Sequence, residues 1–598
     1  MTDTQWSAPR RALIFLAAAF AVAFLLLVGR LAYIQLTSGQ TLRRLAQEQQ
    51  TMRLAVPSFR GAVVDRTGRP LAATVESYSV FADPKLFLEG LAERAADSGS
   101  AADRGAAVAQ LASVLGLDAA ETDRKIGLDA EKRFVWLKRR VGLPTKEAVR
   151  ALRIRGIGFV PEGDRAHPSA GLAAQLLGTT GAENQGLDGL EYLLDGRLKG
   201  SDGYQVMLVD GKRRPVAAPR AAAQGPTDGQ VVVLTIDLSI QMFTEQALRE
   251  AVKEYHAKGG MAIVMDPATG EILALANHPT FDPANYSAVD DYARRNRLLT
   301  DPYEPGSTFK CFIAPVALER GLVRPGERIF CHNGIYRVRG RTLRDVHAYG
   351  VLSFEDIVVK SSNIGMGLIG LRMGNARLHE ALTRFGFGER TGVLLPGESP
   401  GLVHPLKDWT SLSTTSIPMG YEVMVTPLQM ITAFSSIANG GVLLRPRLVR
   451  YVYAPDGRVL ADLSRPVAVR RSLRRETADY MREHILRDVV TRGTGTKAQI
   501  PGYQVFGKTG TAKKKNPDSK GYSDTLYYGS FIGSAPLRNP RLVAMAVIDE
   551  PQRSRAYFGG SVAAPAVKQI LERSLGYLHI PPDEPLWLAR SQGQPTWD

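Results

Sequence analysis

One stretch near the start of this 598-residue chain limits what it can fold into. After Arg10 and Arg11, residues 12–29 contain no charged side chain. As a helix this run would be about 27 Å long, close to the thickness of the hydrocarbon core of a membrane. Because the apolar region of a cleaved signal peptide is shorter and no small-x-small site follows, we expect an uncleaved transmembrane anchor over residues 11–34. Arginines flank the run on both sides, so they indicate its orientation only weakly.

The rest of the chain is too long for one hydrophobic core and predicts two or three domains. Its composition, with 44% hydrophobic residues, is that of a globular protein. The net charge is +16, but the arginines are scattered rather than clustered with aromatic residues. This favours a solvated basic surface over the binding of a polyanion. A proline- and glycine-rich linker over residues 212–229 suggests a domain boundary at 225/226, and the composition of residues 581–598 predicts a disordered tail.

The two cysteines, Cys311 and Cys331, allow one disulfide in an exported protein. Cys311 lies on a predicted buried helix, where a thiol is a common structural residue, so we expect two free cysteines. The pair Cys331-His332 together with His347 matches no common zinc spacing. No metal site is therefore expected.

A serine and a lysine lie together at the start of a predicted helix. The segment 304–310 reads Glu-Pro-Gly-Ser-Thr-Phe-Lys, and apolar residues at helical spacing predict a helix over 307–318. Ser307 and Lys310 then share one face and can touch. Serine becomes a nucleophile when a neighbouring base takes its proton, and lysine is such a base only when burial or another cation lowers its pKa. The spacing alone is common by chance, so it needs partners.

A second motif, Ser361-Ser362-Asn363, lies between two apolar helical stretches. This position predicts a short loop that faces a cleft. A helix cap is the alternative interpretation of Ser361 and Asn363, because serine and asparagine are good N-cap residues. The two roles are compatible.

A third motif, Lys508-Thr509-Gly510-Thr511, follows a β-rich run. Lysine and threonine can hold a carboxylate, and the glycine lets a peptide lie close to the strand edge and pair with it. The alternatives are an exposed strand lysine at Lys508 and a bulge glycine at Gly510. The run 513–515, three lysines, predicts a solvated loop rather than a second site.

The periodicities around these motifs predict an α+β domain, in which an antiparallel sheet has helices on its faces. A mainly helical subdomain is expected over residues 285–490. The expected strands are 231–236, a hairpin over 261–276, 503–511, 526–535 and 541–549, and the expected flanking helices are 239–255 and 564–575.

In this order the three motifs are those of penicillin-binding proteins and serine β-lactamases. The chain resembles a class B penicillin-binding protein, most closely the cell-division (septal) peptidoglycan D,D-transpeptidase. The resemblance extends from the membrane segment to about residue 575. It includes five further stretches: Arg60–Gly68, Gly186–Glu191, Thr235–Asp237, Thr426–Gln429 and Gly559–Pro565.

The resemblance implies a penicillin-recognising transpeptidase domain over residues 226–580 on a non-catalytic, dimerisation-like pedestal over 35–225. It also implies a single-pass protein of the bacterial inner membrane, with residues 1–10 cytoplasmic and the catalytic domain periplasmic. The implied partners are peptidoglycan stem peptides, β-lactams, the membrane, a membrane glycosyltransferase and other division proteins. Neither a cofactor nor nucleic acid is implied.

The implied reaction is acyl transfer, in which Ser307 attacks the penultimate D-alanine of a stem peptide and a neighbouring amine resolves the acyl-enzyme. Lys310 is assigned as the base; Lys508 is the alternative. The backbone N–H groups of Ser307 and Thr511 would form the oxyanion hole. The assigned catalytic residues are Ser307, Lys310, Ser361 and Asn363, and the assigned substrate-binding residues are Lys508, Thr509, Gly510 and Thr511.

Other functions share these motifs. A β-lactamase is typically smaller and lacks an anchor and pedestal, and a penicillin sensor would need further membrane spans or an output domain. A non-catalytic β-lactam-binding scaffold is harder to reject from sequence. Within the family, an elongation-type enzyme is the alternative to a septal one, while sporulation relatives often carry C-terminal repeats that are absent here.

Overall fold

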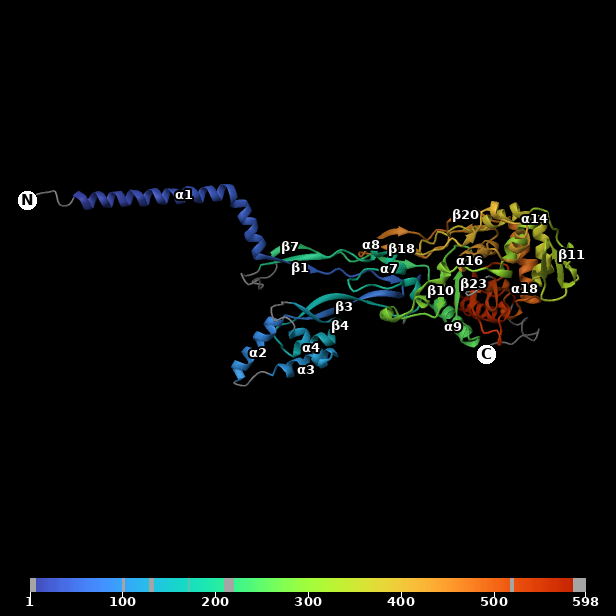
Figure 1. The fold of residues 1–598 in the computed structure, drawn as a ribbon, viewed down its shortest axis with the longest axis horizontal. Coiled ribbons are helices and arrows are strands. Elements are labelled where there is room, and N and C mark those ends of the chain that lie inside the picture. Colours follow the sequence, from blue (N-terminus) through green and yellow to red (C-terminus); the bar gives the residue numbers. More distant parts are fainter. Residues whose placement is uncertain are drawn as a thin grey trace, which may run out of the picture. The chain divides into compact units, whose positions relative to one another are not determined.

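The computed structural model describes residues 7–98, 103–127, 134–169, 171–208, 220–516 and 521–584 (Figure 1). The chain forms two compact units, one of residues 1–58 with 201–227 and one of residues 59–200 with 228–598. Most of the expected disordered tail, residues 585–598, and residues 1–6 of the expected cytoplasmic tail lie outside the described residues. The domain boundary at 225/226 stays a prediction.

The described part of the first unit contains one long helix and a three-stranded sheet. Helix α1 (Ser7–Gln50) contains the expected anchor, and its segment Arg10–Thr37 has a mean hydropathy of 2.8 and no buried side chains. By length and composition this segment can cross a membrane. The sheet has the order β1-β6-β7, with β1 (Thr51–Val56), β6 (Gly203–Leu208) and β7 (Arg220–Gln224). The described part of the predicted linker therefore contains a strand.

The second unit begins with a sheet that crosses the predicted domain boundary. Strand β2 (Val63–Val64) pairs in parallel with β8 (Val231–Leu234), which pairs with β18 (Val449–Tyr453). The seven-stranded sheet continues through β3 (Pro70–Ala82) and also includes β4 (Val135–Val141), β5 (Ile157–Ala166) and β19 (Val459–Asp462). The nearby helices are α2 (Pro84–Ser98), α3 (Arg104–Leu115), α4 (Ala119–Gly127), α5 (Leu143–Ala151), α6 (Ala174–Leu177), α7 (Gly189–Leu193) and α8 (Asp195–Leu198).

A buried ion network holds the stretches Arg60–Gly68 and Gly186–Glu191 together. Arg60 and Arg165 both contact the carboxylate of Glu191, with shortest N–O distances of 2.6 and 2.5 Å. The three side chains are at most 2% exposed. Asp195 accepts a further bond from Arg60 at 2.6 Å. Because each buried charge has a partner of opposite sign, these residues serve packing within the second unit.

A five-stranded antiparallel sheet forms the centre of the C-terminal part of the second unit. Its order is β10-β9-β23-β22-β21. Alternate residues of β9 point to opposite faces, so that Ile263 packs in the core with α12 (Lys310–Glu319) and α16 while Val264 packs with α9 and α20. The elements are β9 (Gly259–Met265), β10 (Ile272–His278), β21 (Phe506–Lys515), β22 (Tyr522–Ala535), β23 (Leu542–Asp549), α9 (Leu238–Glu254), α16 (Pro427–Ala438) and α20 (Ala564–Tyr577).

The strand expected over 231–236 forms, but as β8 of the seven-stranded sheet rather than in this one. The other predicted strands and the flanking helices of this sheet are confirmed within a few residues. The helical subdomain expected over 285–490 is less purely helical than predicted, because it also contains short antiparallel ribbons. These are β11/β14 (Arg328–Phe330, Val351–Ser353), β12/β13 (Ile335–Val338, Arg341–Arg344), β15/β16 (Leu402–Val403, Val423–Met424) and β17/β20 (Val442–Leu444, Ala468–Arg471).

The helices of this region surround a buried apolar core. Those that adjoin the first two motifs are α12 (Lys310–Glu319), α13 (Phe354–Val359) and α14 (Asn363–Arg384). The others are α16, η1 (Pro283–Ala288), α10 (Asp291–Arg294), α11 (Arg297–Thr300), η2 (Gly306–Phe309), η3 (His332–Gly334), η4 (Leu406–Asp408), α15 (Ser413–Ser416), η5 (Ile417–Met419), α17 (Arg475–Tyr480), η6 (Met481–Leu486) and α18 (Arg487–Thr491). Two short helices, η7 (Thr496–Ala498) and α19 (Gly559–Val562), follow this region in the chain.

Both cysteines are buried and free, as predicted.

Candidate active site

Ser307 lies in a tight turn that leads into helix α12. The predicted helix over 307–318 starts as the 3₁₀ turn η2, and its α-helical part begins at Lys310. Gly306 has a φ of +57°, and a Cβ there would lie 2.9 Å from the carbonyl oxygen of Thr511. Only glycine fits this left-handed and crowded position without strain. Phe309 is fully buried, so the turn is fixed on both sides of Ser307.

The side chain of Lys310 is fully buried beneath this turn. Its Nζ lies 2.6 Å from the carbonyl oxygen of Ser361, 2.9 Å from Oδ1 of Asn363 and 3.2 Å from Oγ of Ser361. Among the described residues, Lys310 makes no direct hydrogen bond to Ser307. Burial, and next the nearby charge of Lys508, lower the pKa of Lys310 well below its usual range, although Asp345 opposes the shift.

The Ser361–Asn363 motif forms the predicted loop, between α13 and α14. The N-cap of α14 is Ser362, whose Oγ accepts from the N–H of Gly365 at 2.9 Å, so the capping role considered for Ser361 and Asn363 belongs to the residue between them. Ser361 instead has a φ of +60°, a conformation that costs energy for a residue with a Cβ. This backbone directs its carbonyl and hydroxyl to the lysines.

Asp345 fixes the same loop from outside the three motifs. Its carboxylate accepts from the Ser362 hydroxyl at 2.6 Å and from the backbone N–H groups of Asn363 and Ile364. A carboxylate at a helix N-terminus is electrostatically favourable. Asp345 lies in none of the motifs, so sequence reasoning missed it. The β12/β13 ribbon, which ends at Arg344, brings it to the loop.

Lys508 and the two threonines of the third motif lie on strand β21. Lys508 is fully buried, and its Nζ lies 3.1 Å from Oγ of Ser361 and 3.1 Å from the carbonyl oxygen of Thr509. Burial lowers the pKa of Lys508 to about 7. The hydroxyl of Thr509 bonds to that of Thr494 at 2.6 Å, and Thr511 Oγ1 accepts from the N–H of Gly559 at 3.0 Å.

Gly510 allows β21 to pack directly against the turn η2 and Pro305 before it, which carry Ser307 and are called the nucleophile turn below. A Cβ at this position would lie 2.5 Å from Oγ of Ser530, 2.8 Å from Cγ2 of Thr308 and 2.9 Å from the carbonyl oxygen of Pro305. This close packing is a different reason for glycine than the peptide approach predicted from the sequence. Strand β21 is also at the edge of its sheet, and no other described strand pairs with its outer side.

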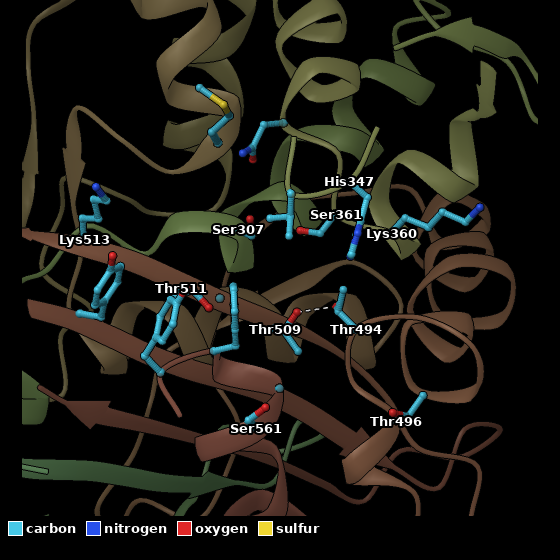
Figure 2. Close-up of a pocket in the computed structure, with 18 of the residues that line it drawn as sticks. Ser307, His347, Lys360, Ser361, Thr494, Thr496, Thr509, Thr511, Lys513 and Ser561 are labelled. Atoms are coloured by element: carbon cyan, nitrogen blue, oxygen red, sulfur yellow. Dashed lines mark hydrogen bonds between the residues drawn. The ribbon is translucent and has the colours of Figure 1, made fainter. Parts of the chain in front are cut away.

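A cleft of about 660 Å³ connects the three motifs. Figure 2 shows Ser307 and Ser361 on one side of it and Thr509 and Thr511 on the other. The remaining lining residues are Val346, His347, Tyr349, Lys360, Asn363, Met419, Tyr421, Thr494, Thr496, Lys497, Gly510, Lys513, Tyr527, Tyr557, Phe558, Gly560 and Ser561. The structure thus brings all three predicted motifs to one place.

Several of these residues could not be assigned from sequence. Thr494 alone is marked in the sequence, because a glycine stands on each side of it. In the structure both glycines pack against Val489 of α18. Tyr421 and the aromatic group of Tyr527, Tyr557 and Phe558 carry no comparable signal. Within the described residues, no group of three His, Cys, Asp or Glu side chains could hold a metal ion.

The chemistry available in the cleft is nucleophilic. Ser307 lines the cleft at the start of a helix, and two buried amines, those of Lys310 and Lys508, meet at Ser361 in the same cleft. The lowered pKa of Lys310 favours the neutral form that can accept a proton. The adjoining edge strand offers free backbone groups to an extended peptide. Together these features suit transfer of an acyl group from a peptide to serine.

Comparison with known proteins gives the same result. Residues 260–572 match the penicillin-binding protein transpeptidase domain, and residues 55–234 match the penicillin-binding protein dimerisation domain. The chain is 33% identical to the probable peptidoglycan D,D-transpeptidase PbpC of Pseudomonas aeruginosa, over 94% of each chain. It is also 33% identical to the peptidoglycan D,D-transpeptidase FtsI of Escherichia coli, over 94% of this chain and 91% of that one.

Among solved structures, penicillin-binding protein 3 of Mycobacterium tuberculosis in complex with aztreonam superposes with a TM-score of 0.68. It shares 30% sequence identity and covers 89% of this chain and 99% of its own. The fold and the cleft therefore define a serine acyltransferase of the penicillin-recognising type. The chain belongs to the class B penicillin-binding proteins. The predicted family, fold class and enzyme class are confirmed.

Proposed function

We propose that the protein is a peptidoglycan D,D-transpeptidase that cross-links stem peptides in septal wall synthesis through an acyl-enzyme on Ser307. The observation that carries this proposal is the burial of Lys310 beneath the nucleophile turn, at hydrogen-bond distance from Ser361 and Asn363. Burial, and next the positive charge of Lys508, lower the pKa of Lys310 and favour its neutral amine. The septal assignment rests on similarity to FtsI and its relatives; an elongation role is the alternative.

The contacts of Lys310 suit the base of the acylation step. A neutral amine has two N–H donors and one lone pair. The carbonyl of Ser361 and Oδ1 of Asn363 can take the two donors, at 2.6 and 2.9 Å, and leave the lone pair for the proton of Ser307. Ser307 Oγ then forms a bond to the carbonyl carbon of the penultimate D-alanine.

Collapse of the tetrahedral intermediate breaks the peptide bond, and the leaving amine of the terminal D-alanine takes up a proton. Ser361 is the proposed relay, because its hydroxyl lies 3.2 Å from Nζ of Lys310 and 3.1 Å from Nζ of Lys508. The backbone N–H groups of Ser307 and Thr511 are the proposed oxyanion hole, which contributes on the order of 3 kcal/mol per donor. An amine of a second stem peptide then displaces Ser307.

The third motif supplies the proposed binding site for the terminal carboxylate of the donor peptide. Thr509 and Thr511 line the cleft, and Lys508 lies behind them. Protonated Lys508 would attract the carboxylate, and Asn363 would hold the substrate amide. Gly510 keeps the strand in contact with the turn that carries Ser307.

We further propose that α1 anchors the protein in the bacterial inner membrane, with the N-terminus cytoplasmic and the catalytic part periplasmic. The length and hydropathy of Arg10–Thr37 support the anchor. The proposed substrate, peptidoglycan, supports the periplasmic position of the catalytic part. The proposed partners are β-lactams, a membrane glycosyltransferase and other division proteins.

The test combines penicillin labelling with a turnover assay on the full-length protein in detergent. Intact mass and peptide mapping should show a slowly decaying adduct on Ser307, absent from Ser307→Ala. Stem pentapeptides should then release D-alanine and form cross-linked dimers. Rapid decay of the adduct would indicate a β-lactamase, and labelling without turnover on stem peptides, with and without membranes, would indicate a scaffold.

A further inference from the structure

The charged side chains that line the cleft are all those of lysines. Lys360, Lys497 and Lys513 line it, and none of its described lining residues is Asp or Glu. A cleft lined by charges of one sign favours a ligand of the opposite sign. The proposed function places one carboxylate, at the end of the donor peptide, beside Lys508. That single charge leaves the three lining lysines unexplained, so the structure favours a substrate with a further anionic group.

Strand geometry selects Lys513 among these lysines. The run 513–515 is not the solvated loop that the sequence predicted, because β21 continues through it to Lys515. Thr509, Thr511 and Lys513 alternate along β21 and all line the cleft. With a rise of about 3.3 Å per residue, Lys513 lies about 7 Å beyond Thr511 and about 13 Å beyond Thr509.

A stem peptide paired with the open edge of β21 has the same rise. If its terminal carboxylate lies at Thr509, the peptide runs antiparallel to the strand, and its third residue from the end lies about 7 Å along, near Thr511. A long side chain on that residue can span the remaining distance of about 7 Å to Lys513. The third residue from the end is the one that precedes the D-alanyl-D-alanine pair.

The present contacts of Lys513 leave it available to a ligand. Its only ion pair among the described residues is with Asp524, and the two side chains are 41% and 85% exposed. An exposed pair of this kind contributes little and is readily exchanged. Lys514, in contrast, is 17% exposed and is held by both Asp549 and Glu550.

We propose that Lys513 selects donor peptides in which the residue before D-alanyl-D-alanine carries a free side-chain carboxylate, over the same peptides with a carboxamide. This rests on the proposed function and deepens it, because it names the substrate class. The carboxylate replaces Asp524 as the partner of Lys513. The three lysines favour the binding of anionic ligands in the cleft. Lys513 determines which residue of the donor peptide must carry the carboxylate.

The test uses the full-length protein in detergent and two synthetic stem pentapeptides that differ only in this carboxylate or carboxamide. Each peptide is measured by kcat/KM for D-alanine release and by how far it slows penicillin labelling of Ser307. The carboxylate peptide should be preferred about two- to fivefold in both measurements, the range expected for a partly exposed ion pair. Lys513→Gln should remove the preference, whereas Asp524→Asn, which frees Lys513, should increase it.

Lys407→Gln is the matched control, because Lys407 is exposed and does not line the cleft; it should leave the preference unchanged. Equal competition by the two peptides in the native protein, or a preference that persists in Lys513→Gln, would overturn the inference. Penicillin labelling itself does not depend on this carboxylate. A protein that labels at Ser307 and treats both peptides alike therefore refutes the selectivity alone, and a protein that never labels refutes the proposed function.

Discussion

Nζ of Lys310 lies 2.6 Å from the backbone carbonyl oxygen of Ser361, and Ser361 presents that oxygen from a left-handed backbone with a φ of +60°. A backbone acceptor cannot be lost by side-chain rotation, so it holds the amine in one place. The strained conformation has a physical role, because it directs both oxygens of Ser361 to the buried lysines.

The first prediction concerns Lys310 as the base. Lys310→Ala should slow penicillin acylation of Ser307 by about 10²- to 10⁴-fold, the range of general-base catalysis. Stopped-flow labelling with a fluorescent penicillin measures this rate, with Lys407→Ala as the surface control. If Lys310→Ala acylates at a near-native rate while Lys508→Ala does not, the two lysines have exchanged roles.

Ser361 allows its hydroxyl to be separated from its backbone conformation. Ser361→Ala removes the hydroxyl and keeps a strained Cβ, whereas Ser361→Gly removes both, so the glycine variant should be more stable by roughly 1 kcal/mol. Both variants should acylate slowly. Thermal denaturation and penicillin labelling of the two proteins give the comparison, and near-native labelling of either variant would argue against the proton relay.

The pH dependence should reflect the two buried lysines. Toward acid, Lys310 takes up a proton and can no longer act as a base, so acylation falls. Above about pH 7 the free enzyme loses the charge of Lys508, whose pKa is about 7, and kcat/KM for a carboxylate-bearing donor falls as well. The expected profile of kcat/KM is bell-shaped.

A β-lactam and its carboxylate methyl ester test the origin of the alkaline limb. The ester has no charge for Lys508 to attract, so its second-order acylation rate should keep rising or level off above pH 7. Identical alkaline limbs for the acid and the ester would show that Lys508 does not bind the carboxylate.

Gly510 should tolerate no side chain. In Gly510→Ala the new Cβ would lie 2.5 Å from Oγ of Ser530 and 2.9 Å from the carbonyl oxygen of Pro305, so β21 must move away from the nucleophile turn. We expect at least a tenfold loss of penicillin acylation and a lower melting temperature. Gly576→Ala is the control, since nothing lies within 4 Å of its Cβ position; equal behaviour of the two variants would contradict the packing argument.

The buried network around Glu191 should matter for stability rather than chemistry. Glu191→Gln leaves the charges of Arg60 and Arg165 buried without a carboxylate between them, which we expect to cost about 3–5 kcal/mol. The loss of stability is measured by the melting temperature and by limited proteolysis. Asp123→Asn breaks the exposed pair with Arg104, where the side chains are 47% and 38% exposed, and should have little effect.

The sequence by itself determined the local structures and the motifs. Residues 12–29 predict a helix long enough to cross a membrane, and α1 forms there. The alternating strands and amphipathic helices of the central sheet were found within a few residues. Ser307, Lys310 and the Lys508–Thr511 strand could be named because each motif is a short run of residues with fixed chemistry.

Only the tertiary structure decided which groups meet. The contact of Lys310 with Ser361 and Asn363, the carboxylate of Asp345 behind the loop and the hydroxyl of Thr494 beside Thr509 join segments far apart in sequence. The tertiary structure also assigned the cap to Ser362 and extended β21 through Lys513 into the cleft. Periodicity reports how a segment faces its immediate surroundings, whereas contacts across the fold depend on packing that no local pattern encodes.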